Sequence, residues 1–286
     1  EQQLPLVIPT CNNYIVNRIL LKMITGQITS AFMMAALSGA SKTQIIREFK
    51  KTYDLQDKEI EEIIRICAFK AKPKKINYRD FYKNPITEKA EKFNYPFTQI
   101  YYIENFLTDA DCQDLIEVID RNLRPSTVSD PKDTGLISNY RTSKTADLNY
   151  FHSPLYLSID RKINSLVELS PFQGETMQSQ KYEPGEYYKE HWDFYSPLEK
   201  EYKIYCEWMG QRTWTTMIYL NDVEEGGETY FKHLKLKVKP KKGMLLGWNN
   251  LYRNGLPNYK TMHEALPPIK GNKYVITKWW RSWSLI

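Results

Sequence analysis

The 286-residue chain has little of what defines several common classes of protein. Its four cysteines are scattered without a C-x-x-C pair, which argues against a zinc–thiolate site and against a disulfide-stabilised scaffold. No segment approaches the roughly 20 apolar residues that a membrane span needs. Residues 1–5 lack the basic start and apolar core of a secretory signal. We therefore expect a cytoplasmic protein that has no membrane partner.

Positive charge is concentrated near the start of the chain. The net charge is +6, and residues 1–80 hold 13 Lys and Arg against 8 Asp and Glu. The cluster Lys70, Lys72, Lys74 and Lys75 supplies most of this excess. A solvated linker explains the cluster, and a site for an acidic partner is the alternative. Abundant aromatic residues (21 Tyr, 11 Phe, 7 Trp) predict a substantial core and an aromatic-lined cleft.

Three regions can be distinguished along the chain, and the first, residues 1–70, is expected to be mostly helical. Ser41 is a candidate N-cap, and Ile60 begins an apolar stripe at helical spacing that ends at Cys67. Short extended segments precede these helices, an order that resembles the winged-helix domain with which peptide-modifying enzymes recognise a precursor. The resemblance implies that residues 1–70 recognise a peptide. A helical scaffold and a dimerisation module are the alternatives.

Residues 71–97 read as a linker, and residues 98–286 as a domain of short strands with flanking helices. Thr108 and Asp111 have the spacing of a capping box, and Pro154 suits the first turn of a second helix. From about Met177 the pattern has period two; Leu234, Leu236 and Val238, for example, alternate with lysines. Many short strands separated by turn residues predict a mainly β jelly roll or sandwich.

One motif indicates a metal centre. His191 and Asp193 form an H-x-D pair, which places both side chains on one face of a strand. With the distant His263 they make a two-histidine, one-carboxylate triad that can hold Fe(II) and leave positions open for substrates. Lys273 then offers a cation for the far end of a dicarboxylate co-substrate. Zinc is an alternative metal, although a hydrolytic zinc site would have no use for this lysine.

Further motifs occur between and around these residues. They are Gln211-Arg212-Thr213, Thr216 to Asn221, Glu225 to Thr229, Pro240 to Leu246, Gly271-Asn272-Lys273 and Thr277-Lys278-Trp279. In this order and spacing, with the triad, they resemble the prolyl 4-hydroxylase-like family of Fe(II)/2-oxoglutarate dioxygenases. The resemblance runs from about Ile100 to Trp283 and implies a double-stranded β-helix. It also implies Fe(II), 2-oxoglutarate and O2, with ascorbate as a possible reductant.

The resemblance assigns roles to residues around the triad. Lys273 and Thr229 would hold the far carboxylate of 2-oxoglutarate, and Tyr182 would lie beside this co-substrate. The structural alternatives are that Thr229 only ends a strand and that Tyr182 only packs in the core. The substrate side would be formed by Tyr188, Arg212, Trp279 and Arg141.

One departure from the family concerns the substrate. Arg281 stands where some prolyl hydroxylases have a histidine, two residues after the matched Trp279. An Arg212 fully occupied by a structural carboxylate is the alternative to a substrate contact at that position. We expect hydroxylation of an unactivated C–H bond, foremost in a prolyl residue of a peptide or protein. Another peptidyl residue of a ribosomal precursor, or a free amino acid, is the alternative substrate. The non-enzymatic alternative is a basic module that binds a partner or nucleic acid, although we expect no nucleic-acid partner.

Overall fold

The computed structural model describes residues 42–53, 56–58, 60, 76–82, 89–129, 139–147, 154–169, 173–206 and 210–282. Several predictions for the N-terminal region fall outside these residues. They concern the extended segments, the N-cap at Ser41, the helix that continues to Cys67 and the lysine cluster. Within the described residues, no helix has the length and apolar character needed to cross a membrane.

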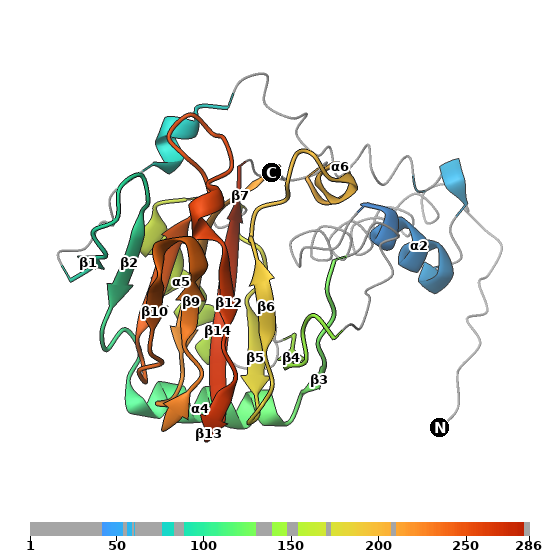
Figure 1. Cartoon of the computed structure of the whole chain (residues 1–286). Coiled ribbons are helices and arrows are strands. Elements are labelled where there is room, and N and C mark those ends of the chain that lie inside the picture. The colour runs from blue at the N-terminus through green and yellow to red at the C-terminus, as the bar shows by residue number, and fades with distance from the viewer. Residues whose placement is uncertain are drawn as a thin grey trace, which may run out of the picture.

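The larger of two facing sheets contains eight strands. They span Glu91–Lys92 (β1), Ile100–Ile103 (β2), Leu245–Asn249 (β11), Arg212–Tyr219 (β7), Lys273–Arg281 (β14), Gln178–Tyr182 (β5), Lys144–Ala146 (β4) and Arg124–Pro125 (β3), in that spatial order. Every neighbouring pair is antiparallel. The long strands β7 and β14 form the centre of this sheet (Figure 1).

The smaller sheet faces the larger one and carries most of the metal triad. Its strands, in spatial order, span Leu236–Val238 (β10), Thr229–Phe231 (β9), His263–Ala265 (β12) and Tyr188–His191 (β6). A separate two-stranded sheet pairs Pro268–Lys270 (β13) with Glu225–Gly226 (β8). The two facing antiparallel sheets form the expected double-stranded β-helix.

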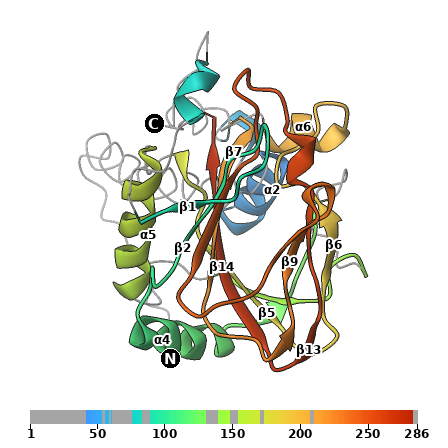
Figure 2. The same cartoon turned by 60° about the vertical axis from the view of Figure 1, so that its left-hand side comes forward.

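Helices flank the larger sheet. The structure has α-helices at Lys42–Tyr53 (α2), Asp109–Asp120 (α4), Pro154–Val167 (α5) and Lys200–Tyr205 (α6), and 3-10 turns at Tyr78–Phe81 (η1), Lys232–Leu234 (η3) and Tyr259–Thr261 (η4). α4 and α5 lie on the face of the larger sheet that points away from the smaller sheet (Figure 2). Apolar side chains of both helices share one buried cluster with this face, so the helices support the site from behind.

Two local predictions can be compared directly with the structure. The capping box is confirmed: the Thr108 hydroxyl accepts from the Asp111 amide, and the Asp111 carboxylate accepts from the Thr108 amide. The predicted strand that begins at Leu234 was wrong at its start. Leu234 ends the 3-10 turn η3, and Lys235 adopts a left-handed conformation (φ 52°) that breaks the alternation. The strand therefore begins at Leu236.

Parts of the predicted linker pack on the β domain. β1 pairs with β2, and Phe81 of η1 is buried. The carbonyl of Phe81 accepts from the Trp214 indole at 2.7 Å and from Asn249 at 2.9 Å. N-terminal to this segment, α2 lies against α6 (Figure 1). The domain boundaries at 70 and 97 stay a prediction.

Candidate metal and co-substrate site

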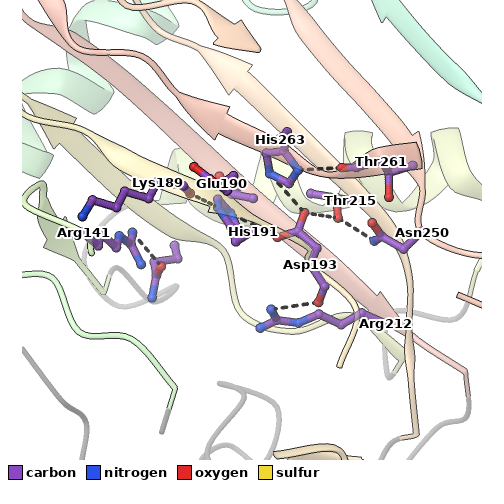
Figure 3. A network of polar contacts seen from close by, with 12 residues as sticks. Arg141, Lys189, Glu190, His191, Asp193, Arg212, Thr215, Asn250, Thr261 and His263 are labelled. Carbon is purple, nitrogen blue, oxygen red and sulfur yellow. Dashed lines mark hydrogen bonds and ion pairs between the residues drawn. The ribbon is translucent and has the colours of Figure 1, made fainter. Parts of the chain in front are cut away.

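The structure brings the three predicted metal ligands together. His191 ends β6, Asp193 follows it, and His263 begins β12 directly opposite His191 in the antiparallel pair. One ligand atom from each side chain lies within 4.8 Å of the others, and Asp193 and His263 are buried (Figure 3). Pairing of β6 with β12 therefore places the local H-x-D pair beside a histidine more than 70 residues away in sequence.

Both histidines present the same nitrogen to the metal position. Nδ1 of His191 lies 2.8 Å from the carbonyl oxygen of Lys189, and Nδ1 of His263 lies 3.0 Å from that of Thr261 (Figure 3). Because a carbonyl oxygen accepts, each Nδ1 must donate, and each Nε2 keeps a lone pair for a metal. Burial and the neighbouring His263 lower the pKa of His191 to about 3, so its ring is neutral at physiological pH.

Two polar residues that sequence reasoning missed orient the carboxylate ligand. The Thr215 hydroxyl donates to Oδ2 of Asp193 at 2.7 Å and accepts from Asn250 at 2.8 Å (Figure 3). Hydrogen bonds of this kind fix the geometry of a metal ligand. Strand alternation offers a partial signal for Thr215, which is two residues from Met217 on the same face of β7. No sequence signal identifies Asn250, which lies just beyond β11.

Lys273 is a buried cation without a partner. It is 1% exposed, and its Nζ has no hydrogen-bond partner within the described part of the chain. Nζ lies over the rings of Tyr182 (5.2 Å) and Tyr219 (5.6 Å). Burial lowers the pKa of Lys273 to about 7. An orphaned ammonium in such a place fits a ligand carboxylate, which would restore its charge and supply its missing acceptors.

The other predicted co-substrate residues lie around this lysine. Tyr182 faces Lys273 across the β5–β14 pair, and both side chains are buried. The hydroxyl of Tyr219 donates to Oγ1 of Thr229 at 2.7 Å. The sequence analysis assigned no role to Tyr219, although this residue lies in the Thr216 to Asn221 motif and ends β7. Tyr182, Tyr219 and Thr229 thus bring three buried hydroxyl groups to an otherwise apolar cluster beside Lys273.

On the substrate side, Arg141 and Tyr188 form a stack with a metal ligand. The Tyr188 ring lies parallel to the His191 ring with 3.6 Å between centroids, and the Arg141 guanidinium lies 4.9 Å from the Tyr188 ring centre. The backbone of residues 140–142 pairs with the outer edge of β6 and holds Arg141 there. Of the polar stretch from Thr127 to Tyr140 that precedes Arg141, the structure describes the two ends, to residue 129 and from residue 139.

Arg212 and Trp279, two of the predicted substrate residues, also lie together. The Arg212 guanidinium lies 4.2 Å from the Trp279 ring centre, and Trp279 faces the same side of β14 as Lys273, opposite Thr215. Arg212 is held by Glu175 in a two-pronged ion pair, with Nε–Oε1 at 2.7 Å and Nη2–Oε2 at 2.8 Å. Glu175 is a further residue that the sequence reading missed, since no motif surrounds it.

The third histidine among the described residues, His233, is exposed in η3, and His152 lies outside the described residues. Within the described part of the chain, His191, Asp193 and His263 form the group that could hold a metal ion.

Comparison with known proteins defines the class to which this site belongs. Residues 177–281 match the model of the 2OG-Fe(II) oxygenase superfamily, a span that contains the triad and Lys273. Within that class, the chain resembles the prolyl hydroxylases.

Curated relatives and solved structures point in the same direction. Prolyl 4-hydroxylase subunit alpha-1 of Gallus gallus is 30% identical over 243 residues, which cover 80% of this chain and 46% of that subunit. Prolyl 4-hydroxylase 2 of Arabidopsis thaliana is 31% identical over 202 residues, 63% of this chain and 66% of the relative. The chain thus spans less than half of the alpha-1 subunit that it matches.

A solved structure supports the fold assignment. The viral collagen prolyl hydroxylase of Paramecium Bursaria Chlorella virus-1, solved as a 2OG complex, superposes with a TM-score of 0.51 at 28% identity. The match covers 64% of this chain and 95% of the viral enzyme.

Proposed function

We propose that the chain is an Fe(II)- and 2-oxoglutarate-dependent dioxygenase that hydroxylates a prolyl residue of a peptide or protein. The observation that carries the proposal is the buried Nζ of Lys273, which has no hydrogen-bond partner among the described residues. It lies on the same face of the larger sheet as Thr215, the residue that donates to Asp193 of the triad. A lysine placed in this way is costly to the fold unless a ligand anion joins it. The prolyl 4-hydroxylases among the relatives support the choice of substrate.

Each part of the site has a task in this reaction. Nε2 of His191, Nε2 of His263 and the Asp193 carboxylate would hold Fe(II), which together with 2-oxoglutarate supplies the oxidising chemistry when bound. Lys273 and Thr229 would fix the far carboxylate of the co-substrate. The hydrogen bond from Thr215 keeps the carboxylate of Asp193 in one orientation, which would prepare this ligand for the metal.

The substrate side is lined with flat groups. Trp279 and Tyr188 present aromatic rings against which a proline ring can pack, and the Arg212 guanidinium offers a hydrogen-bond donor beside them. These contacts suit a ring held rigidly near the metal, where small displacements lower the rate. Peptide recognition by residues 1–70 is part of the proposal and is supported by the contact of α2 with α6, the helix that follows the H-x-D segment.

A spectroscopic titration tests the metal and co-substrate assignments. Anaerobic addition of Fe(II) and 2-oxoglutarate to the purified chain should produce a visible metal-to-ligand charge-transfer band. His263→Ala should abolish the band and Lys273→Ala should weaken it, whereas the exposed control His233→Ala should leave it unchanged. A folded native chain that shows no band would rule out the dioxygenase assignment and favour zinc chemistry or a binding role.

Removal of residues 1–70 tests the recognition role. If peptide turnover is lost while the charge-transfer band remains, the N-terminal region recognises the substrate. If the shortened chain aggregates, the region supports the β domain, as the packing between α2 and α6 would then require.

A further inference from the structure

Three arginines lie on the substrate side of the site, and one buried carboxylate other than the metal ligand pairs with two of them. Arg212 and Arg281 are opposite each other in the β7–β14 pair, and both contact Glu175. Arg141 lies on the other side of Tyr188. The number of positive charges therefore exceeds the number of negative charges that the chain provides there.

The first two arginines share a single negative charge. Arg281, which is 2% exposed, places Nε 2.5 Å from Oε1 of Glu175 and donates from Nη1 to the carbonyls of Tyr205 and Gly210. The Glu175 carboxylate also accepts hydrogen bonds from Nε and Nη2 of Arg212. Burial would raise the pKa of Glu175, but the two arginines outweigh it and lower the pKa, so the carboxylate is ionised. The cluster of Glu175, Arg212 and Arg281 consequently carries one net positive charge.

Arg212 turns the remaining part of its guanidinium toward the backbone of the metal ligand Asp193. Its Nη1 makes one long contact, 3.4 Å to the backbone carbonyl of Asp193, while Nε and Nη2 are occupied by Glu175 (Figure 3). The Arg212 side chain is 16% exposed, whereas Glu175 is 3% exposed. Nη1 is thus the donor of this cluster that a ligand beside the metal can reach.

Arg141 adds a second uncompensated charge. Its guanidinium is 9% exposed and contacts neutral oxygens of Ser143, Thr145, Gln178 and the Thr127 backbone at 3.1–3.4 Å. Among the described residues, no carboxylate lies within ion-pair distance of it. Burying a guanidinium against neutral acceptors alone is unfavourable, which points to an anionic ligand nearby.

The metal and co-substrate do not remove this excess. Fe(II), the Asp193 carboxylate, the Lys273 ammonium and a bound dicarboxylate cancel one another. Arg141 and the Glu175–Arg212–Arg281 cluster then leave two positive charges around the position of the substrate. A neutral prolyl peptide would leave both uncompensated in a buried cavity.

We propose that the substrate carries a carboxylate close to the hydroxylated carbon, and that Nη1 of Arg212 binds it. This inference rests on the proposed function and specifies its substrate class. The carboxylate can belong to a free or C-terminal amino acid, or to an acidic side chain beside the target residue. Arg281 determines the preference, because a histidine at this position would leave Glu175 and Arg212 as a neutral pair.

Two matched pairs of compounds test the inference on the full-length, iron-loaded chain. The first pair is L-proline and L-prolinamide; the second is the acetylated, amidated dipeptide Glu-Pro and its Gln-Pro counterpart. Each pair differs by one carboxylate. We expect the carboxylate member of at least one pair to bind about tenfold more tightly or better, the effect of one charge-assisted hydrogen bond. Binding is read from the change in the anaerobic Fe(II)–2-oxoglutarate band, and turnover from succinate.

The pairs also separate the two sources of the carboxylate. A preference for L-proline indicates a free or terminal carboxylate, and a preference for Glu-Pro indicates an acidic neighbour. Equal or tighter binding of both neutral members overturns the inference, and so does the absence of any response to all four compounds. In both cases a band formed without substrate would leave the dioxygenase assignment intact, whereas a missing band would refute that assignment first.

Variants at position 281 test whether Arg281 causes the preference for a substrate carboxylate. Arg281→Lys keeps the charge and should keep the preference, whereas Arg281→His should reduce it about tenfold toward the neutral member. The charge-transfer band without substrate should be the same in both variants, since Lys273 and the triad are untouched. An unchanged preference in Arg281→His would refute the role of this arginine, and the substrate pairs decide the main inference without either variant.

Discussion

Two buried lysines of β14 allow a sharp test of the co-substrate site. Lys273 has no hydrogen-bond partner, whereas Lys278, on the opposite face of the same strand, pairs with Asp160 at 2.5 Å. Both are nearly fully buried, at 1% and 2% exposure. We predict that methionine has opposite effects at the two positions in the metal-free chain: Lys273→Met stabilises the fold and Lys278→Met destabilises it.

The magnitude for Lys273 follows from its pKa. Burial lowers this pKa from 10.5 to about 7. Each pKa unit is worth about 1.4 kcal/mol, so the lysine costs the fold about 5 kcal/mol below pH 7 and about 2 kcal/mol near pH 9. The sign follows from proton binding: between these two pKa values the unfolded chain binds a proton that the folded chain lacks. Native stability therefore rises with pH in this window, and the gain from Lys273→Met shrinks.

The change in stability at Lys278 has the opposite sign because the substitution leaves the buried Asp160 carboxylate without its cation. Asp160 is 5% exposed, and without Lys278 its carboxylate would be buried without an ion partner. Breaking a buried pair from one side costs about 3–5 kcal/mol. Comparison of the two variants thus separates the cost of an orphaned lysine from the general cost of changing β14.

Urea unfolding of the chelator-treated chains at several pH values measures both effects. Lys273→Met should raise the free energy of unfolding most at low pH, and it should weaken the charge-transfer band formed with Fe(II) and 2-oxoglutarate. A Lys273→Met chain that is less stable than the native chain near pH 7 would refute the reasoning. So would a gain that does not change with pH, because the stabilisation would then not come from the lysine charge.

Three further changes have predictable effects. Thr215→Val removes the 2.7 Å hydrogen bond to Asp193 and should weaken Fe(II) binding about 10- to 100-fold in a metal titration; unchanged affinity would mean that Asp193 needs no orientation. Gly243→Ala places a methyl group 2.5 Å from the Leu107 carbonyl at φ +74°, so we expect a loss of more than about 2 kcal/mol in urea unfolding; a smaller loss would show that this turn can shift. Thr108→Ala removes the N-cap of α4 and should cost about 1 kcal/mol, with no change in the charge-transfer band; a neutral effect would mean that water replaces the cap.

The sequence predicted those parts of the site that depend on short-range rules. His191 and Asp193 share a strand face because their spacing is two, and Lys273 and Trp279 share one because their spacing is even. The order of motifs then identified His263, whose position depends on pairing between β12 and β6. These predictions concern side chains whose direction is fixed by the strand that carries them.

The missed residues depend on contacts between distant segments. Glu175 lies in a short irregular stretch before β5 and forms ion pairs with Arg212 and Arg281, which belong to two other strands. Asn250 reaches Thr215 from beyond the end of β11. No periodicity marks a polar residue whose partners come from other elements, so such residues become visible once the strand order is known. The left-handed Lys235 was missed for a local reason, since a lysine there gives no signal of a positive φ.

The segment that carries Arg141 also forms backbone hydrogen bonds along the outer edge of β6. β6 is an outer strand of the smaller sheet, and exposed outer strands attract further strands from other molecules. Residues 140–142 satisfy that edge with hydrogen bonds from Thr142 to Tyr187 and from Lys189 to Tyr140, each 3.0 Å long. The same segment places Arg141 against Tyr188. Loss of this segment would thus leave the strand that carries His191 open to self-association, so protection against aggregation and the position of Arg141 beside Tyr188 depend on one stretch of chain.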